Sequence, residues 1–187
     1  MTASDVLIAL YPGVSAFEAL GALATLRAAS VPARLVAPEA LVRAQEGARI
    51  VPEDLGYDAL PAAPAVVLPH GDVTRALADP ALARALRQRR GHFTLAGGDA
   101  VRLLHAAGLA EGRRVACVPG EAPLAGTTPV HARLVADARL LTCFPGDALL
   151  DLVLHYVGHE HGHERALRAA GALGREHKPF AFGQDPR

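Results

Sequence analysis

Short apolar runs alternate with helix-like segments along most of this chain. Asp5–Tyr11, Ala33–Ala37 and Ala65–Pro69 are nearly continuous apolar stretches of the length of buried strands, and segments with helical periodicity lie between them and after them. Strands that are apolar on both faces are typical of a parallel sheet with helices on both sides, because neither face contacts water. The sequence therefore predicts an α/β fold, a three-layer sandwich around a mostly parallel, doubly wound sheet of the flavodoxin-like type.

The other expected elements follow the same alternation. In the first helix, capped by Ser15, we expect Phe17, Leu20, Leu23 and Ala24 to form the inner face. The expected helices run over Ala16–Ala29, from Asp79 to about Arg90, from its cap Asp147 to about His161, and over Glu164–Leu173. A further strand is expected at 114–118, with small hairpins at 42–51 and 132–143.

Composition limits the classes of function. The 187 residues predict a single domain over 1–187, with a core of about 5–173 and a surface tail over 176–187. The formal net charge is zero, and only 4% of the residues are aromatic, with no Trp, so we expect no nucleic-acid partner. No apolar run reaches the ~18–20 residues of a membrane span, so we expect no membrane partner and a cytoplasmic protein with reduced cysteines.

Residues 92–109 predict a short buried strand, a Gly97-Gly98 turn and a helix that ends near Gly108. This is the arrangement in which many α/β enzymes hold an exposed nucleophile, but Gly98 has no side chain. In a doubly wound sheet the site lies at the carboxyl ends of the strands. The loops expected there are Pro12–Ser15, Pro69–Asp72, Gly97–Asp99 and Val118–Glu121.

Five segments, in order, resemble the DJ-1/PfpI (ThiJ/PfpI) superfamily, which is similar to class I glutamine amidotransferases. VLIALYPGVSAFE resembles its first strand, glycine turn and glutamate-bearing helix, and VVLPHGD resembles its strand and Pro-Gly-Gly turn. AGGDAVRLLHAAGLAEGRR resembles its nucleophile-elbow helix, RVACVPGE the next strand and turn, and LVADARLLTCFPGDALLDLVLHYV its late strand and helix. The resemblance covers roughly residues 5–173 and implies a homodimer, across the first helix and the histidine-bearing late helix.

The resemblance also implies site residues. The family's glutamate falls on Glu18, its elbow cysteine on Gly98, and its histidine on Val118. The chain therefore retains the glutamate and departs from the family at the other two positions, which predicts a pseudoenzyme without thiol chemistry.

Several residues near these loops have two readings. Glu18 is either a solvated carboxylate in the first helical turn or a pocket-facing group with a raised pKa. His70 points either into the pocket, where it pairs with Glu18, or into solvent. Backbone N–H groups of Gly71 and Asp99 are candidates for an anion site, and the Asp99 side chain is expected to cap its helix rather than act as a base. Beside Gly98 we expect a thiol-sized space able to hold water.

The remaining candidates are cysteines and histidines. Cys117 is expected to be buried, whereas Cys143, before a Pro-Gly turn, is the more exposed thiol. His159 and His163 formally satisfy the zinc-protease pattern H-E-x-x-H, but Gly162 interrupts the segment, so solvated histidines at a helix end are the preferred interpretation of the cluster that starts at His155.

The sequence thus supports two main hypotheses. The first is a family member with a degenerate elbow that binds a small molecule or serves in stress response, without thiol catalysis and without a cofactor. The second is a non-covalent glyoxalase, hydratase or lyase that uses Glu18, with His70, on a small carbonyl compound. A zinc hydrolase is the remote third.

Overall fold

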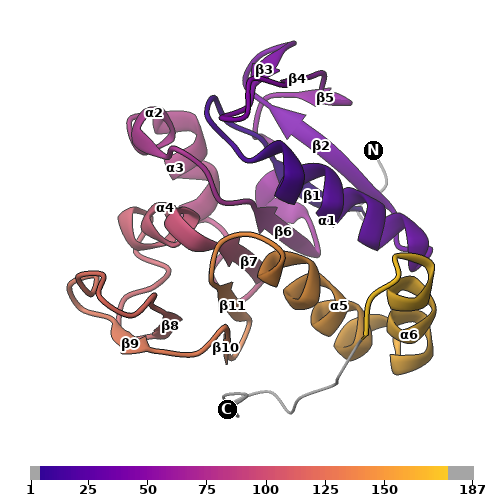
Figure 1. The fold of residues 1–187 in the computed structure, drawn as a ribbon. Helices are drawn as coiled ribbons and strands as arrows, with labels where there is room; N and C mark the ends of the chain where they lie inside the picture. The colour runs from indigo at the N-terminus through magenta and orange to yellow at the C-terminus, as the bar shows by residue number, and fades with distance from the viewer. Residues whose placement is uncertain (1–4, 177–187) are drawn as a thin grey trace.

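A seven-stranded sheet forms the middle of the computed structural model, which describes residues 5–176 (Figure 1). The strand order is β10-β11-β7-β6-β1-β2-β5, and all neighbours are parallel except the β10–β11 hairpin. The strands are β1 (Val6–Ala9), β2 (Ala33–Ala37), β5 (Asp54–Leu55), β6 (Ala65–Leu68), β7 (Phe93–Gly97), β10 (Leu134–Asp137) and β11 (Leu140–Cys143).

Helices cover the sheet in two layers. The first layer contains α1 (Ala16–Ala28), α5 (Ala148–His161) and α6 (His163–Ala172), which contact one another. The second contains α2 (Thr74–Leu77), α3 (Pro80–Arg87) and α4 (Val101–Ala106), and Figure 1 shows the two groups on opposite sides of the strands. Two 3₁₀ turns, η1 (Leu60–Ala62) and η2 (Gly98–Ala100), complete the helical segments. The predicted three-layer α/β sandwich is confirmed.

Burial explains why these strands read as continuous apolar runs. Every residue of β1, β6, β7 and β11 is buried, because each strand has a neighbour on both edges and other elements pack on its faces. Within the described residues, no helix is both long enough and apolar enough to cross a membrane.

Two small sheets lie outside the main one. β3 (Val42–Arg43) and β4 (Arg49–Ile50) form the hairpin expected around Glu46-Gly47. The strand expected at 114–118 is present as β8 (Arg114–Ala116), but it pairs with β9 (Thr128–Val130) and not with the main sheet. Side chains of the main sheet hold β8 in place. Asp137 of β10 accepts from the backbone N–H of Arg114 (2.8 Å), and Thr142 of β11 accepts from that of Ala116 (2.8 Å).

The predicted inner face of α1 was wrong for three of its four residues. Leu23 is buried, but Phe17 is 55% exposed, Leu20 is 46% exposed and Ala24 is exposed. The residues that α1 buries are Ala16, Glu18, Ala19, Ala22, Leu23, Thr25 and Leu26. Because apolar residues surround this helix on nearly all sides, their spacing does not define one face.

The predicted caps of α1 and α5 differ in outcome. Ser15 caps α1 as expected: its hydroxyl oxygen accepts from the N–H of Glu18 (3.3 Å). Asp147 precedes α5 but makes no side-chain cap, because its carboxylate pairs with Arg133 (2.7 Å) and Arg175 (3.4 Å). The tail expected over 176–187 lies, apart from Glu176, outside the described residues.

Candidate functional site

Three of the four predicted loops meet at the carboxyl ends of β1, β6 and β7. The N–H of Asp72 donates to the carbonyl of Gly13 (2.9 Å), and the N–H of Ser15 donates to the carbonyl of His70 (2.7 Å). The N–H of Asp99 donates to Nδ1 of the His70 ring (3.1 Å). The β6–α2 loop therefore holds the β1–α1 loop on one side and the β7–α4 junction on the other.

Gly71 is the point where two of these loops touch most closely. A Cβ at this position would lie 2.3 Å from the carbonyl oxygen of Gly13 and 2.7 Å from the Cα of Val14. Only a residue without a side chain fits against the backbone there. Close packing thus explains why position 71 is a glycine, independently of the anion binding that the sequence predicted for its N–H.

The carboxylate of Glu18 lies inside this loop cluster and not in solvent, since the residue is 1% exposed. One oxygen accepts from the backbone N–H of His70 (2.6 Å), and the other accepts from the backbone N–H of Gly146. Burial raises the pKa of Glu18 to about 7, because the charged form loses hydration, while the two N–H donors oppose this shift. The carboxyl group connects helix α1 to the loops after β6 and β11.

The β7–α4 junction has the backbone shape of an elbow. Gly98 adopts φ +46°, in the left-handed region, directly after the last residue of β7. A Cβ on the preceding Gly97 would lie 2.6 Å from a carboxylate oxygen of Glu18. A side chain at either position would therefore be strained, at Gly97 by overlap with the carboxylate and at Gly98 by the left-handed backbone conformation.

The expected thiol-sized space beside Gly98 is filled. A Cβ at this position would lie 2.6 Å from Nδ1 of His70 and 2.9 Å from the Cβ of Pro145. His70 therefore points toward the elbow, and its side chain remains 24% exposed. Because Nδ1 accepts the N–H of Asp99, the ring carries its hydrogen on Nε2.

The N–H of Asp99 already donates to His70. It is therefore not available to the anion site expected at Gly71 and Asp99. The expected cap by the Asp99 side chain was also wrong: neither η2 nor α4 has a side-chain cap. The Asp99 carboxylate is half exposed and lies 4.0 Å from Nδ1 of His70.

A cavity of about 270 Å³ adjoins the elbow. The loop after β8 forms its far wall, so the fourth predicted loop also reaches the site, although β8 is outside the main sheet. Val118 lies in this loop, half-buried, directly after Cys117. The lining residues are Gly98, Asp99, Val101, Arg102, Val115, Ala116, Cys117, Glu121, Ala122, Pro123, Leu124 and Pro129.

The two thiols differ from expectation at one position. Cys117 is buried, as predicted, and its carbonyl contacts Nδ1 of His131 (3.0 Å). Cys143, predicted to be the more exposed thiol, is only 1% exposed, because β11 lies between β7 and β10. Burial raises the pKa of the Cys143 thiol well above its ordinary value.

The histidine cluster is divided between two helices. His159 lies in α5 and His163 begins α6, with Gly162 at φ +96° between them, so the two histidines do not share one helical face. Over residues 5–176, no group of three or more His, Cys, Asp or Glu side chains is placed to hold a metal ion. His155, expected in solvent, is buried in α5.

Three contributors were missed by the sequence reasoning. Gly146 and Gly97 touch Glu18 from segments 128 and 79 positions away, and nothing local in the sequence indicates these contacts. Glu46, at the tip of the β3–β4 hairpin, accepts from the Ser15 hydroxyl (2.8 Å) and from the N–H of Ala16 (2.9 Å). An acidic residue in a hairpin turn was the one available signal for the last contact.

We predict that Gly98→Cys destabilises the protein by about 2–4 kcal/mol, because the new side chain combines left-handed backbone strain with overlap onto His70. The double variant His70→Gly/Gly98→Cys should recover at least ~1 kcal/mol relative to the sum of the single variants. Urea unfolding of the four proteins measures this coupling. Strict additivity would show that the imidazole does not occupy the space beside residue 98.

A second prediction concerns pH. Since the pKa of Glu18 is raised in the folded state, the folded protein binds this proton more tightly than the unfolded chain, and its stability falls as pH rises from about 4.5 through about 7. Relative to Glu18→Gln, which does not titrate, wild type should lose about 2 kcal/mol of unfolding free energy between pH 5 and pH 8. A difference that stays constant across this interval would rule out the raised pKa.

Comparisons with known proteins point to one family. The model of the DJ-1/PfpI family matches residues 4–158. Drosophila melanogaster DJ-1beta superposes with a TM-score of 0.84 at 22% identity, over 93% of this chain and 99% of that one. A mutant DJ-1 superfamily protein from Salmonella typhimurium gives a TM-score of 0.82 at 24% identity, over 92% and 99%. Oxidized Toxoplasma gondii DJ-1 gives a TM-score of 0.82 at 19% identity, over 93% of this chain and 100% of that one.

At this level of identity the superpositions establish the fold. No protein with a curated description matches the sequence. The family model covers most of the chain, including Glu18 and the β7–α4 junction. This protein belongs to the DJ-1/PfpI family.

Proposed function

We propose that this protein binds a small molecule beside the β7–α4 elbow and performs no thiol catalysis. The observation that supports this most directly is the position of His70, whose ring lies where a side chain of residue 98 would begin and accepts the N–H of Asp99. A nucleophile at such a junction needs both a side chain and free N–H donors at the start of the helix. The first is missing at Gly98, and one such donor, that of Asp99, is already bonded.

Neither cysteine provides a substitute thiolate. Cys143 is almost completely buried, and burial keeps its thiol protonated by raising its pKa. Cys117 lines the cavity but is 8% exposed, and its sulfur contacts the carbonyl oxygens of Val118 (3.7 Å) and Glu121 (3.8 Å).

The cavity suits a compact ligand. Its volume of about 270 Å³ lies just below the range of ~300–1,000 Å³ that is common for ligand pockets. Its wall combines apolar groups, such as Val101 and Pro123, with the charged side chains of Asp99, Arg102 and Glu121. This combination favours a small polar metabolite with an apolar part.

A second function, acid/base catalysis by Glu18 on a small carbonyl compound, is favoured by the pKa of about 7 of this carboxyl group. Its geometry is less favourable. Both carboxyl oxygens accept backbone N–H groups, and the residue is 1% exposed, so a substrate has no free oxygen of Glu18 to approach.

A turnover screen with methylglyoxal and related small carbonyl compounds discriminates the two functions. We expect wild type to show no turnover above buffer. Turnover that disappears in Glu18→Gln, with the variant still folded by circular dichroism, would overturn the binding proposal in favour of the enzyme.

Binding itself is tested by thermal shift with the same carbonyl compounds and with small carboxylic acids. We expect stabilising compounds in wild type to lose their effect in Ala122→Trp, because this exposed lining residue can fill the cavity without disturbing the core. Stabilisation that is equal in both proteins would place the ligand elsewhere.

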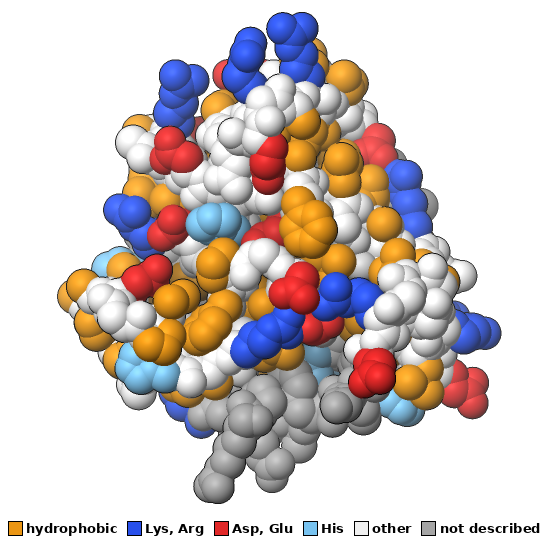
Figure 2. All heavy atoms as spheres, viewed as in Figure 1, with side chains coloured by type: hydrophobic (Ala, Val, Ile, Leu, Met, Phe, Trp, Pro, Cys, Tyr) orange, Lys and Arg blue, Asp and Glu red, His pale blue; other side chains and the backbone are white. Residues whose placement is uncertain are grey.

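We also propose that the protein forms a homodimer through α1. Phe17 and Leu20 are large, exposed and three positions apart on this helix, and Figure 2 has hydrophobic side chains at the surface in the region of α1. We propose that α5, the late helix that bears the histidines, also contributes to this interface.

We predict that Phe17→Lys/Leu20→Lys shifts the protein from dimer to monomer in light scattering coupled to size-exclusion chromatography, because charges on both sides of a symmetric contact repel each other. The matched control is Leu55→Lys, which changes a residue that is 67% exposed at the β5 edge of the sheet. A dimer that persists in the double variant would exclude this face.

A further inference from the structure

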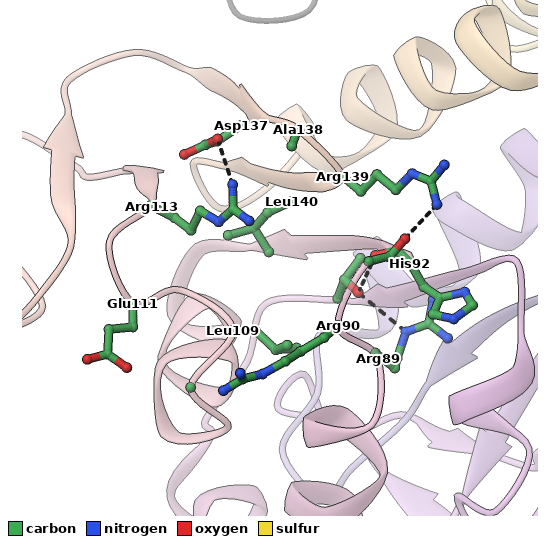
Figure 3. Close-up of a pocket in the computed structure, with 13 residues that line it drawn as sticks. Arg89, Arg90, His92, Leu109, Glu111, Arg113, Asp137, Ala138, Arg139 and Leu140 are labelled. Atoms are coloured by element: carbon green, nitrogen blue, oxygen red, sulfur yellow. Dashed lines mark hydrogen bonds and ion pairs between the residues drawn. The ribbon is translucent and has the colours of Figure 1, made fainter.

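A second cavity, larger than the one beside the elbow, lies away from it. Its volume is about 600 Å³, and it includes Thr94 near the start of β7 and Leu140, the first residue of β11 (Figure 3). β7 extends from Phe93 to Gly97, so at ~3.3 Å per residue the two ends of this strand are about 13 Å apart. The two cavities have no lining residue in common.

Arginines dominate the wall of this cavity. Arg89, Arg90, Arg113 and Arg139 line it together with His92, whereas Glu111 and Asp137 are the acidic residues of the wall. In Figure 3 the side chain of Arg90 passes beside Leu109 and that of Arg113 lies beside Leu140, whereas the guanidinium of Arg139 points away from both leucines. The cavity therefore combines an excess of positive charge with an apolar surface.

The carboxylates within residues 5–176 do not neutralise this charge. Asp137 pairs with Arg113 (3.3 Å), but the ion pairs found among residues 5–176 include none for Arg89, Arg90 or Arg139. The guanidinium of Arg139 donates to the carbonyl of Gly91 (2.6 Å) and lies 5.6 Å from the centre of the Phe93 ring. Both partners are uncharged.

Arg89 is the least expected member, because it is only 1% exposed. Its guanidinium donates to the carbonyls of Leu60, Ala63 and Phe93 and to the Thr94 hydroxyl, which are all neutral acceptors. Burial lowers the pKa of Arg89 to about 10, which still leaves it charged at neutral pH. A buried cation held by neutral groups is stabilised further by an anion nearby.

We propose that this cavity binds a phosphorylated small molecule, with a phosphate group held by Arg90 and with the charges of Arg89 and Arg139 adding to the positive potential of the cavity. Guanidinium groups match the geometry of phosphate oxygens, and three cations without carboxylate partners match an anion of two to three negative charges better than a single carboxylate. Leu109 and Leu140 offer the apolar surface for the organic part. The proposal is independent of the function assigned to the elbow.

Isothermal titration calorimetry of the full chain with inorganic pyrophosphate and with ADP tests this site. We expect both to bind, with affinities that fall at least fivefold between 50 and 300 mM NaCl because the contacts are ionic. Citrate, a carboxylate anion of similar charge, should bind at least fivefold more weakly than pyrophosphate.

Arg90→Gln is the decisive variant. Arg90 is exposed, and no other side chain within residues 5–176 is bonded to it, so the variant should unfold at the wild-type temperature and bind pyrophosphate at least fivefold more weakly. Arg84→Gln, on the exposed side of α3 and outside the cavity, should bind as wild type does. Arg139→Gln is a second variant that should also weaken binding.

Three results would overturn the proposal. These are the absence of heat with both phosphate probes at millimolar concentration, equal loss of affinity in Arg84→Gln and Arg90→Gln, and citrate binding as tight as that of pyrophosphate. The first excludes a ligand of this class, the second indicates only a general effect of surface charge, and the third removes the assignment to phosphate.

Discussion

The buried carboxylate of Glu18 is the contact on which the arrangement of the elbow depends. It enters from the first turn of α1 and accepts N–H groups from the loops after β6 and β11, which are 52 and 128 positions away in sequence. Because the same oxygen that binds His70 also lies against Gly97, the carboxylate sets how closely β7 approaches α1. His70 is oriented by its own backbone bond to Glu18, and its ring then reaches the N–H of Asp99.

The two ends of β7 have opposite electrostatic character. At the carboxyl end, a buried acid is held by backbone N–H dipoles, and burial raises its pKa to about 7 while these hydrogen bonds oppose the shift. At the amino end, a buried guanidinium is held by carbonyl dipoles and stays charged. The same strand therefore connects the cavity that we propose for a small polar molecule with the cavity that we propose for a phosphorylated one.

The sequence could predict the layers, the order of the loops and the burial of the central strands, because these follow from alternating apolar runs. It could not predict the exposed side of α1, where apolar residues surround the helix, or the burial of Cys143, which depends on β10 and β7 lying on either side of β11. The direction of the His70 side chain was left open for a similar reason. It is decided by the backbone bonds of His70 to Ser15 and to Glu18 and by the missing side chain at Gly98, none of which is local to position 70.

The ion pairs around Asp147 give the segment after the last helix a part in the site. Arg175 follows α6 and contacts Asp147 (3.4 Å) and Asp151 (2.7 Å), next to the loop whose Gly146 donates to Glu18. Arg133 contacts the same two aspartates from the segment before β10. A piece of this chain that keeps these ion pairs beside the elbow therefore extends past the end of α6 to Arg175, two positions beyond the boundary that helical periodicity suggests.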